Sequence, residues 1–285
     1  MPIDVDRVVA GEFPPSTYSW SDRDVILYHL GIGAGVPPID EKELRYVYEG
    51  DLQVLPAFAT IPPFSTMMSL GMIDGLDINL AQILHGEHEI VVHRPIPTEG
   101  SVSHEARVTG VYDKGKGALI TMEIVSIDLK TNEPLFTNRP SIFVRGEGGF
   151  GGDSGPAERH TPPDRDPDFL VEYETIPQQA LLYRMSSGDL NPLHADPGFA
   201  MVAGFERPIL HGLCTYGIAL KAAVDSALDG DTTSVAGYSA RFAGVVYPGE
   251  TVTTRIWEQD DVLVLSAGVE DRNATVLSNS RVTVA

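Results

Sequence analysis

Cysteines and long hydrophobic runs are nearly missing from this sequence. The 285-residue chain has one cysteine, Cys214, which excludes an intramolecular disulfide and favours a reducing compartment. Nowhere do about 18 uncharged apolar residues follow one another, so no transmembrane helix is expected. The start, MPIDVDRVVAGEFPP, is acidic and lacks the apolar core of a secretory signal. These features predict a cytoplasmic protein.

Positive charge is also scarce. The chain has 20 lysines and arginines against 40 acidic residues, a formal net charge of −20. Such a surface repels the phosphates of nucleic acids and anionic membranes, so neither is an expected partner. A phosphorylated ligand would need a local basic patch. Arg94, Arg184, Lys221 and Arg241 are available for one, and the sequence gives no reason to choose among them.

Apolar residues, in contrast, make up 42% of the chain, enough for one large or two ordinary domains. Residues 146–168, GEGGFGGDSGPAERHTPPDRDPD, have no apolar periodicity and read as an exposed linker. The alternative, a glycine-rich phosphate cradle, lacks the helix and the Lys-Ser or Lys-Thr that should follow. The predicted division is a first half over 1–145, this linker, and a second half over 169–285.

The two halves repeat each other weakly but in order, which indicates an ancient duplication. At an offset of 155, residues 24–36 align with 179–191, so that Tyr28 meets Tyr183. The same offset aligns residues 54–60 with 209–215, and an offset near 151 aligns 84–97 with 235–248.

Each half also follows one predicted plan. Residues 212–228 are rich in alanine and leucine and long enough for a buried helix. Strand-like runs follow it, and similar runs end the first half. These runs cover 87–95, 101–112, 117–128, 133–145, 234–242, 250–258, 262–270 and 274–285. A helix followed by an antiparallel meander, present twice, predicts an α+β fold in which a curved sheet wraps a helix.

The polar residues of the second half have no counterparts in the first. At the offset of 155, Asp189 aligns with Ala34 and His194 with Ile39. A proline pair at 62–63 also interrupts the first half's helix. We therefore expect a catalytically silent first half whose shortened helix leaves room for a substrate-tail pocket.

The stretch SSGDLNPLHADP, residues 186–197, concentrates reactive side chains. Asp189 and His194 flank Pro192, which restricts the backbone, so a turn can direct both side chains at one point. A carboxylate and an imidazole that share a water molecule can take its proton and return one to a neighbouring carbon. This chemistry suits addition of water to a double bond, but the spacing alone leaves hydrolysis open.

With Tyr183 before it and GFERPILHGLCTYG (204–217) after it, this stretch resembles the signature of the MaoC-like (R)-specific enoyl-CoA hydratases, the enoyl-CoA hydratase 2 family. The resemblance covers the whole chain and extends to actinobacterial members and to the hydratase unit of the peroxisomal multifunctional enzyme type 2. It implies two fused hot dog domains, the second active. It also implies reversible hydration of trans-2-enoyl-CoA to (3R)-3-hydroxyacyl-CoA, in β-oxidation of long, branched or sterol-derived chains.

By position in the family motif, the resemblance implies a catalytic dyad of Asp189 and His194, ordered by Asn191. It also implies that the backbone N–H of Gly212 faces the thioester carbonyl. A helix start suits that role because its amides lack partners and its dipole favours negative charge. Glycine there would let the substrate approach closely. The expected partner is an acyl-CoA thioester, with no cofactor and no metal. Two hot dog copies in one chain can pair internally, so a monomer is feasible, although homodimers are common in the family.

Other histidines have structural interpretations. His211 lies at a helix start and is expected to position the loop. His85, His88 and His93 suggest a metal cluster, but an odd spacing on a strand predicts His85 and His88 on opposite faces. The sequence GIGAG at 31–35 follows a helical pattern, so a structural role is expected rather than a dinucleotide site.

Two other functions stay open at this point. A hot dog thioesterase would hydrolyse the same kind of substrate. A non-catalytic acyl-CoA-binding subunit would bind it without turnover, although the intact dyad argues against this.

Overall fold

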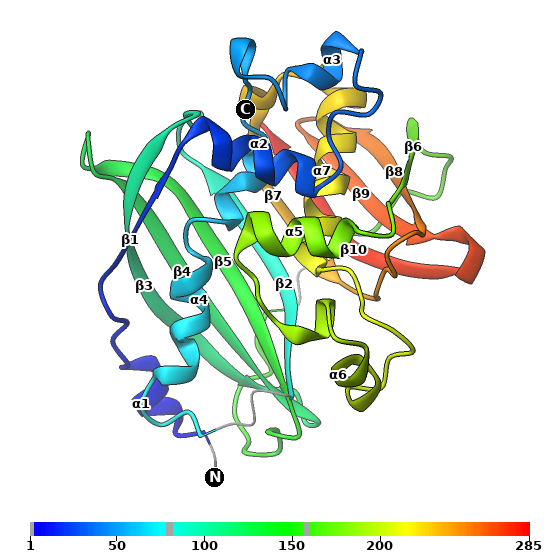
Figure 1. Ribbon diagram of the computed structural model, residues 1–285. Coiled ribbons are helices and arrows are strands. Elements are labelled where there is room, and N and C mark those ends of the chain that lie inside the picture. Colours follow the sequence, from blue (N-terminus) through cyan, green and yellow to red (C-terminus); the bar gives the residue numbers. More distant parts are fainter. Residues whose placement is uncertain (1–2, 78–81, 157–159) are drawn as a thin grey trace.

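A single antiparallel sheet wraps around the helices (Figure 1). The computed structural model describes residues 3–77, 82–156 and 160–285. The strands of the first half are β1 (Ser16–Trp20), β2 (Ile83–Val92), β3 (Gly100–Asp113), β4 (Gly117–Asp128) and β5 (Glu133–Arg145). Those of the second half are β6 (Phe169–Glu174), β7 (Val235–Phe242), β8 (Thr251–Gln259), β9 (Val262–Val269) and β10 (Ala274–Val284).

The order of strands across the sheet reveals the duplication. It is β1-β3-β4-β5-β2-β7-β10-β9-β8-β6, so each half has the same internal order. The halves join where β2 pairs antiparallel with β7, the same strand of each repeat. The predicted α+β class and the repeat are confirmed. The hydrogen bonds between β2 and β7 join the five strands of each half into the one sheet. Between β5 and β6, residues 146–156 and 160–168 contain no helix or strand.

Helices cover the concave side of the sheet and its ends (Figure 1). They are α1 (Val5–Val9), α2 (Asp22–Gly31), α3 (Glu41–Leu44), α4 (Phe64–Met68), α5 (Gln179–Ser187), α6 (Pro197–Val202) and α7 (Gly212–Ala227). Short 3-10 helices are η1 (Glu49–Asp51), η2 (Pro56–Thr60), η3 (Ser69–Met72), η5 (Pro192–His194), η6 (Thr232–Ser234) and η7 (Glu270–Arg272). None of the helices in the described part of the chain is both long and apolar enough to cross a membrane.

Helix α7 is the buried helix that the sequence predicts over 212–228. Apolar and small side chains surround most of its circumference, as a helix enclosed by a sheet requires. At Gly217 a Cβ atom would lie 2.7 Å from the Tyr28 hydroxyl of α2, so the glycine permits this close packing. Tyr28 and Tyr183, paired by the internal repeat, lie on the contacting helices α2 and α5 with ring centroids 6.2 Å apart.

The corresponding segment of the first half is broken, as its prolines predict. A 3-10 helix, η2, ends at Thr60, and α4 starts at Phe64 after the proline pair 62–63. Proline lacks an amide donor and its ring blocks the preceding turn, so one continuous helix cannot form there. The space opposite α7 is therefore filled by short helical pieces.

The short strands β1 and β6 were not predicted. Each spans five or six residues, too few for a periodic pattern to stand out from neighbouring loops. Both lie at the outer edges of the sheet, where β1 pairs with β3 and β6 with β8.

The prediction that His85 and His88 face opposite sides of the sheet is wrong. The register of β2 against β5 shifts between His85 and Glu87, which indicates a β-bulge at Gly86. The extra residue reverses the alternation, so the two rings meet with centroids 5.1 Å apart. Side chains alternate between the two faces of a sheet only in a regular strand, so the spacing rule does not hold across a bulge.

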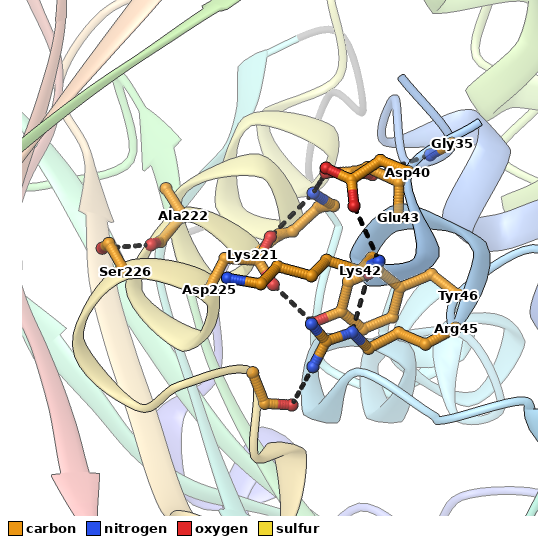
Figure 2. Close-up of polar contacts among 11 residues, drawn as sticks. Gly35, Asp40, Lys42, Glu43, Arg45, Tyr46, Lys221, Ala222, Asp225 and Ser226 are labelled. Carbon is orange, nitrogen blue, oxygen red and sulfur yellow. Dashed lines mark hydrogen bonds and ion pairs between the residues drawn. The ribbon is translucent and has the colours of Figure 1, made fainter. Parts of the chain in front are cut away.

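A cluster of charged side chains fastens α7 to α3 and the residues after it (Figure 2). Lys221 Nζ lies 2.6 Å from Glu43 and 2.8 Å from Asp225, and its side chain is 13% exposed. The Tyr46 hydroxyl donates to Asp225 at 2.6 Å. These contacts join the first half to the central helix of the second.

Replacing Lys221 by methionine should lower the free energy of unfolding by about 3 kcal/mol, because it leaves two carboxylates close together and largely buried without their cation. Urea unfolding measures the change. The matched control is Lys42→Met on exposed α3, which should change stability by less than about 0.5 kcal/mol. Equal stability of the two variants would contradict a structural role for the cluster.

Candidate active site

The loop that carries Asp189 follows α5 directly. Gly188 ends the helix in the left-handed conformation, with φ of 73°. The amide of Asn191 then donates to Asp189 Oδ1 at 3.0 Å, and the amide of Leu193 donates to Asn191 Oδ1 at 3.0 Å. Two successive Asx turns thus fix the loop, and they explain why Asp, Asn and Pro occur here together.

His194 lies buried at the end of this loop. Its Nδ1 is 2.9 Å from the carbonyl oxygen of Ile209. A carbonyl can only accept, so Nδ1 carries the proton and Nε2 keeps a free lone pair. Burial lowers the pKa of His194 below 6.5, against the opposing effect of the Asp189 charge. The ring is therefore neutral near pH 7 and able to accept a proton.

His211 contacts both members of the predicted dyad. Its ring stacks on that of His194 with centroids 3.7 Å apart, and its Nε2 lies 3.4 Å from the carbonyl oxygen of Asp189. Burial, reinforced by His194, lowers the pKa of His211 to about 2, so this ring stays neutral. The contacts place His211 where a loop-positioning residue is expected.

Gly212 follows His211 as the first residue of α7. The amide of a first helical residue has no acceptor within its own helix, so it is available to a ligand. A Cβ at Gly212 would lie 3.0 Å from Cδ1 of Phe242. Glycine thus lets the Phe242 ring pack closely here, in addition to the expected close approach of the substrate.

The geometry of the three polar residues suits a shared water molecule. A carboxylate oxygen of Asp189 and one ring nitrogen each of His194 and His211 lie within 4.8 Å of one another. A water molecule at hydrogen-bond distance from two of them fits this separation. A metal ion fits poorly, because the two imidazole planes are stacked and a ligand lone pair lies in the plane of its ring.

These residues border a large open cavity of about 2710 Å³. Asp189, Asn191, His194, His211 and Gly212 all line it from the second half. The first half contributes an apolar wall of the residues Phe64, Met67, Leu70 and Met72. This wall comes from the broken helical segment opposite α7.

The pKa of His194 leads to a predicted pH profile. A general base acts when unprotonated, and a lowered pKa keeps His194 unprotonated to lower pH. The value of kcat/KM should therefore stay constant from pH 7.5 down past about 6.5, the ordinary histidine pKa, and fall only below it. Initial rates in overlapping buffers test this, and an acidic midpoint above about 6.5 would refute the neutral base.

The four basic residues considered for phosphate binding differ in their surroundings. Lys221 and Arg94 are engaged with carboxylates, the latter 3.5 Å from Asp128. Arg184 donates to the carbonyl of Asn191 at 3.0 Å and so supports the loop. Arg241 is exposed and lines the cavity.

Two family models match most of the chain. The MFE-2 hydratase 2 N-terminal domain matches residues 18–146, and the MaoC like domain matches residues 158–278. The chain is 47% identical to the enoyl-CoA hydratase ChsH3 of Mycobacterium tuberculosis, over 98% of each protein. It is 38% identical to the probable enoyl-CoA hydratase 2 of Dictyostelium discoideum, over 100% of this chain and 97% of that protein.

Solved structures agree on the fold. A MaoC-like dehydratase from Phytophthora capsici superposes with a TM-score of 0.87 and 31% identity, over 99% of each chain. A Mycobacterium tuberculosis protein described as a double hotdog fold superposes with a TM-score of 0.57 at 13% identity, over 96% of each chain. The predicted pair of hot dog domains is thereby confirmed, and this chain belongs to the MaoC-like enoyl-CoA hydratase 2 family.

Proposed function

We propose that this protein reversibly adds water to a trans-2-enoyl-CoA and forms the (3R)-3-hydroxyacyl-CoA. One observation carries the proposal: a carboxylate oxygen of Asp189 and a ring nitrogen of His194 lie within 4.8 Å of each other, in a cavity that Gly212 at the start of α7 also lines. The Ile209 carbonyl occupies Nδ1 of His194, so Nε2 is the nitrogen left to accept a proton. Asn191 orders this arrangement through its Asx turn.

The chemistry follows from these positions. Asp189 and His194 orient the water, and Nε2 takes its proton as the oxygen bonds to C3 of the substrate. The π electrons move to C2 and the thioester oxygen, where the Gly212 amide and the positive end of the α7 dipole stabilise the enolate. The dyad then delivers a proton to C2. One O–H bond breaks, one C–O and one C–H bond form, and the double bond is lost.

The first half is proposed as the wall for the acyl tail. Phe64, Met67 and Met72 provide apolar and adaptable surface, which suits long, branched or sterol-derived chains. This supports a role in β-oxidation. We further propose the division into 1–145, 146–168 and 169–285, and a cytoplasmic location favoured by the single cysteine. A monomer and a homodimer both stay open.

A series of enoyl-CoAs of rising bulk tests the proposal. Loss of enoyl absorbance, with a product of 3R configuration by chiral chromatography, is expected, and the bulky members should remain substrates. Stoichiometric release of free CoA thiol without loss of enoyl absorbance would instead indicate a thioesterase. No turnover of crotonyl-CoA by the purified chain would favour a binding subunit.

A further inference from the structure

A row of polar side chains, buried at Asn138 and His88 and half-buried at His85, leads from the broken helical segment of the first half toward α7. Asn138 on β5 donates from Nδ2 to the carbonyl of Ala59 in η2 at 3.0 Å. Its Oδ1 lies 2.8 Å from His88 Nε2. His88 Nδ1 lies 3.1 Å from His85 Nε2. The bulge in β2 is what brings the last two rings together.

The amide orientation determines the direction of each hydrogen bond. Oδ1 of Asn138 can only accept, so His88 carries its proton on Nε2 and accepts on Nδ1. His85 therefore donates from Nε2. Burial lowers the pKa of both imidazoles, that of His88 to about 4, and neither is charged near pH 7.

His85, at the other end of this row of side chains, reaches the start of α7 through Phe242. The ring of His85 packs against Phe242 with centroids 4.8 Å apart. Phe242 in turn lies against Gly212, where an added Cβ would come within 3.0 Å of its Cδ1. His88 meets Tyr216, one turn further along α7, with ring centroids 5.6 Å apart.

An apolar cluster would fill this space at lower cost in desolvation, since buried imidazole and amide groups gain little net stability from their hydrogen bonds. Fixed hydrogen bonds do, however, hold a ring in one orientation. Orientation matters at this place because an oxyanion donor acts only at about 2.7–3.1 Å from the developing charge.

We propose that His85, His88, Asn138 and Phe242 are positioning residues that hold the Gly212 amide at the thioester oxygen. The half of the chain without the dyad thereby sets part of the hydration rate. This inference rests on the proposed function.

The test is steady-state hydration of crotonyl-CoA by the full-length His85→Leu variant. A displaced oxyanion donor should lower kcat about tenfold, less than the 10²–10³-fold effect of losing such a donor. KM, and the Kd of the saturated analogue butyryl-CoA by calorimetry, should stay within about twofold, because ground-state binding does not use this alignment. His85→Gln keeps a donor toward His88 and should restore kcat to within about threefold of wild type.

Phe242→Leu leaves the hydrogen bonds of His85, His88 and Asn138 intact and removes the ring contact with Gly212. Phe242 also lines the cavity, so the Kd of butyryl-CoA separates this role from direct contact with the substrate. The substitution should lower kcat to a similar degree. The double variant His85→Leu, Phe242→Leu should lose little more, because both changes disturb the same series of contacts to Gly212. If His85→Leu does not fold, the kcat and Kd of Phe242→Leu alone test the positioning role.

Wild-type kcat in folded Phe242→Leu, or a weakened Kd that accounts for the whole loss, would overturn the positioning role. Wild-type protein and Asp189→Asn are assayed in parallel. Absence of hydration by the wild type, or full activity of Asp189→Asn, would overturn the proposed function itself.

Discussion

Replacing Asp189 by asparagine is expected to lower kcat for enoyl-CoA hydration at least about 10²-fold, the lower range for general acid-base catalysis. Asparagine keeps the size of the side chain and can still accept the amide hydrogen bond of Asn191, so the loop should keep its shape. It removes the negative charge that orients the water and supports the imidazolium formed at His194. The effect should therefore fall on turnover rather than on folding.

Asp196→Asn is the matched control for this change. Asp196 lies on the same segment, but its exposed side chain caps α6 by accepting from the amides of Gly198 and Phe199. Asparagine is an equally good helix cap, so rates and stability should stay near wild type. Similar activities of Asp189→Asn and Asp196→Asn would contradict a catalytic role for Asp189.

His194→Gln is expected to reduce kcat by a comparable factor of about 10² or more. Glutamine can donate to the carbonyl of Ile209 in place of Nδ1, yet it has no basic lone pair for the proton of water. Stacking on His211 is lost as well. Stopped assays with high enzyme concentration measure the residual rate.

The control for His194→Gln is His93→Gln. His93 directly follows β2, its ring contacts Thr137, and it is not among the residues that line the cavity at Asp189. This variant should hydrate at the wild-type rate. The Asp189→Asn, His194→Gln double variant should be little worse than either single variant, because residues that act as a unit give non-additive effects. Strictly multiplicative losses would show that the two side chains act separately.

The regular parts of the fold were predictable because their patterns are long. Helix α7 and the four long strands of each half extend over eight or more residues, so composition and periodicity identify them. The internal repeat predicted which strands correspond, and the strand order bears this out. The loop at Asp189 was also predictable, since Asx turns depend on the local order of Asp, Asn and Pro.

Features that depend on distant partners were not predictable. The bulge at Gly86 follows from pairing β2 with β5, and no local pattern marks it. The contact of Phe242 with Gly212 joins residues that lie far apart in sequence. One clue was present, because an isolated glycine inside a strand, here Gly86, can signal a bulge. That clue could have shown that His85 and His88 share a side of the sheet.

The placement of the reacting atoms is tested most directly by a crystal structure of the wild-type protein with a (3R)-3-hydroxyacyl-CoA. The account predicts the 3-hydroxyl oxygen within hydrogen-bond distance of both the Asp189 carboxylate and His194 Nε2, and the thioester oxygen at the Gly212 amide. A ligand whose C3 lies away from these two side chains, or whose thioester oxygen faces elsewhere, would contradict it.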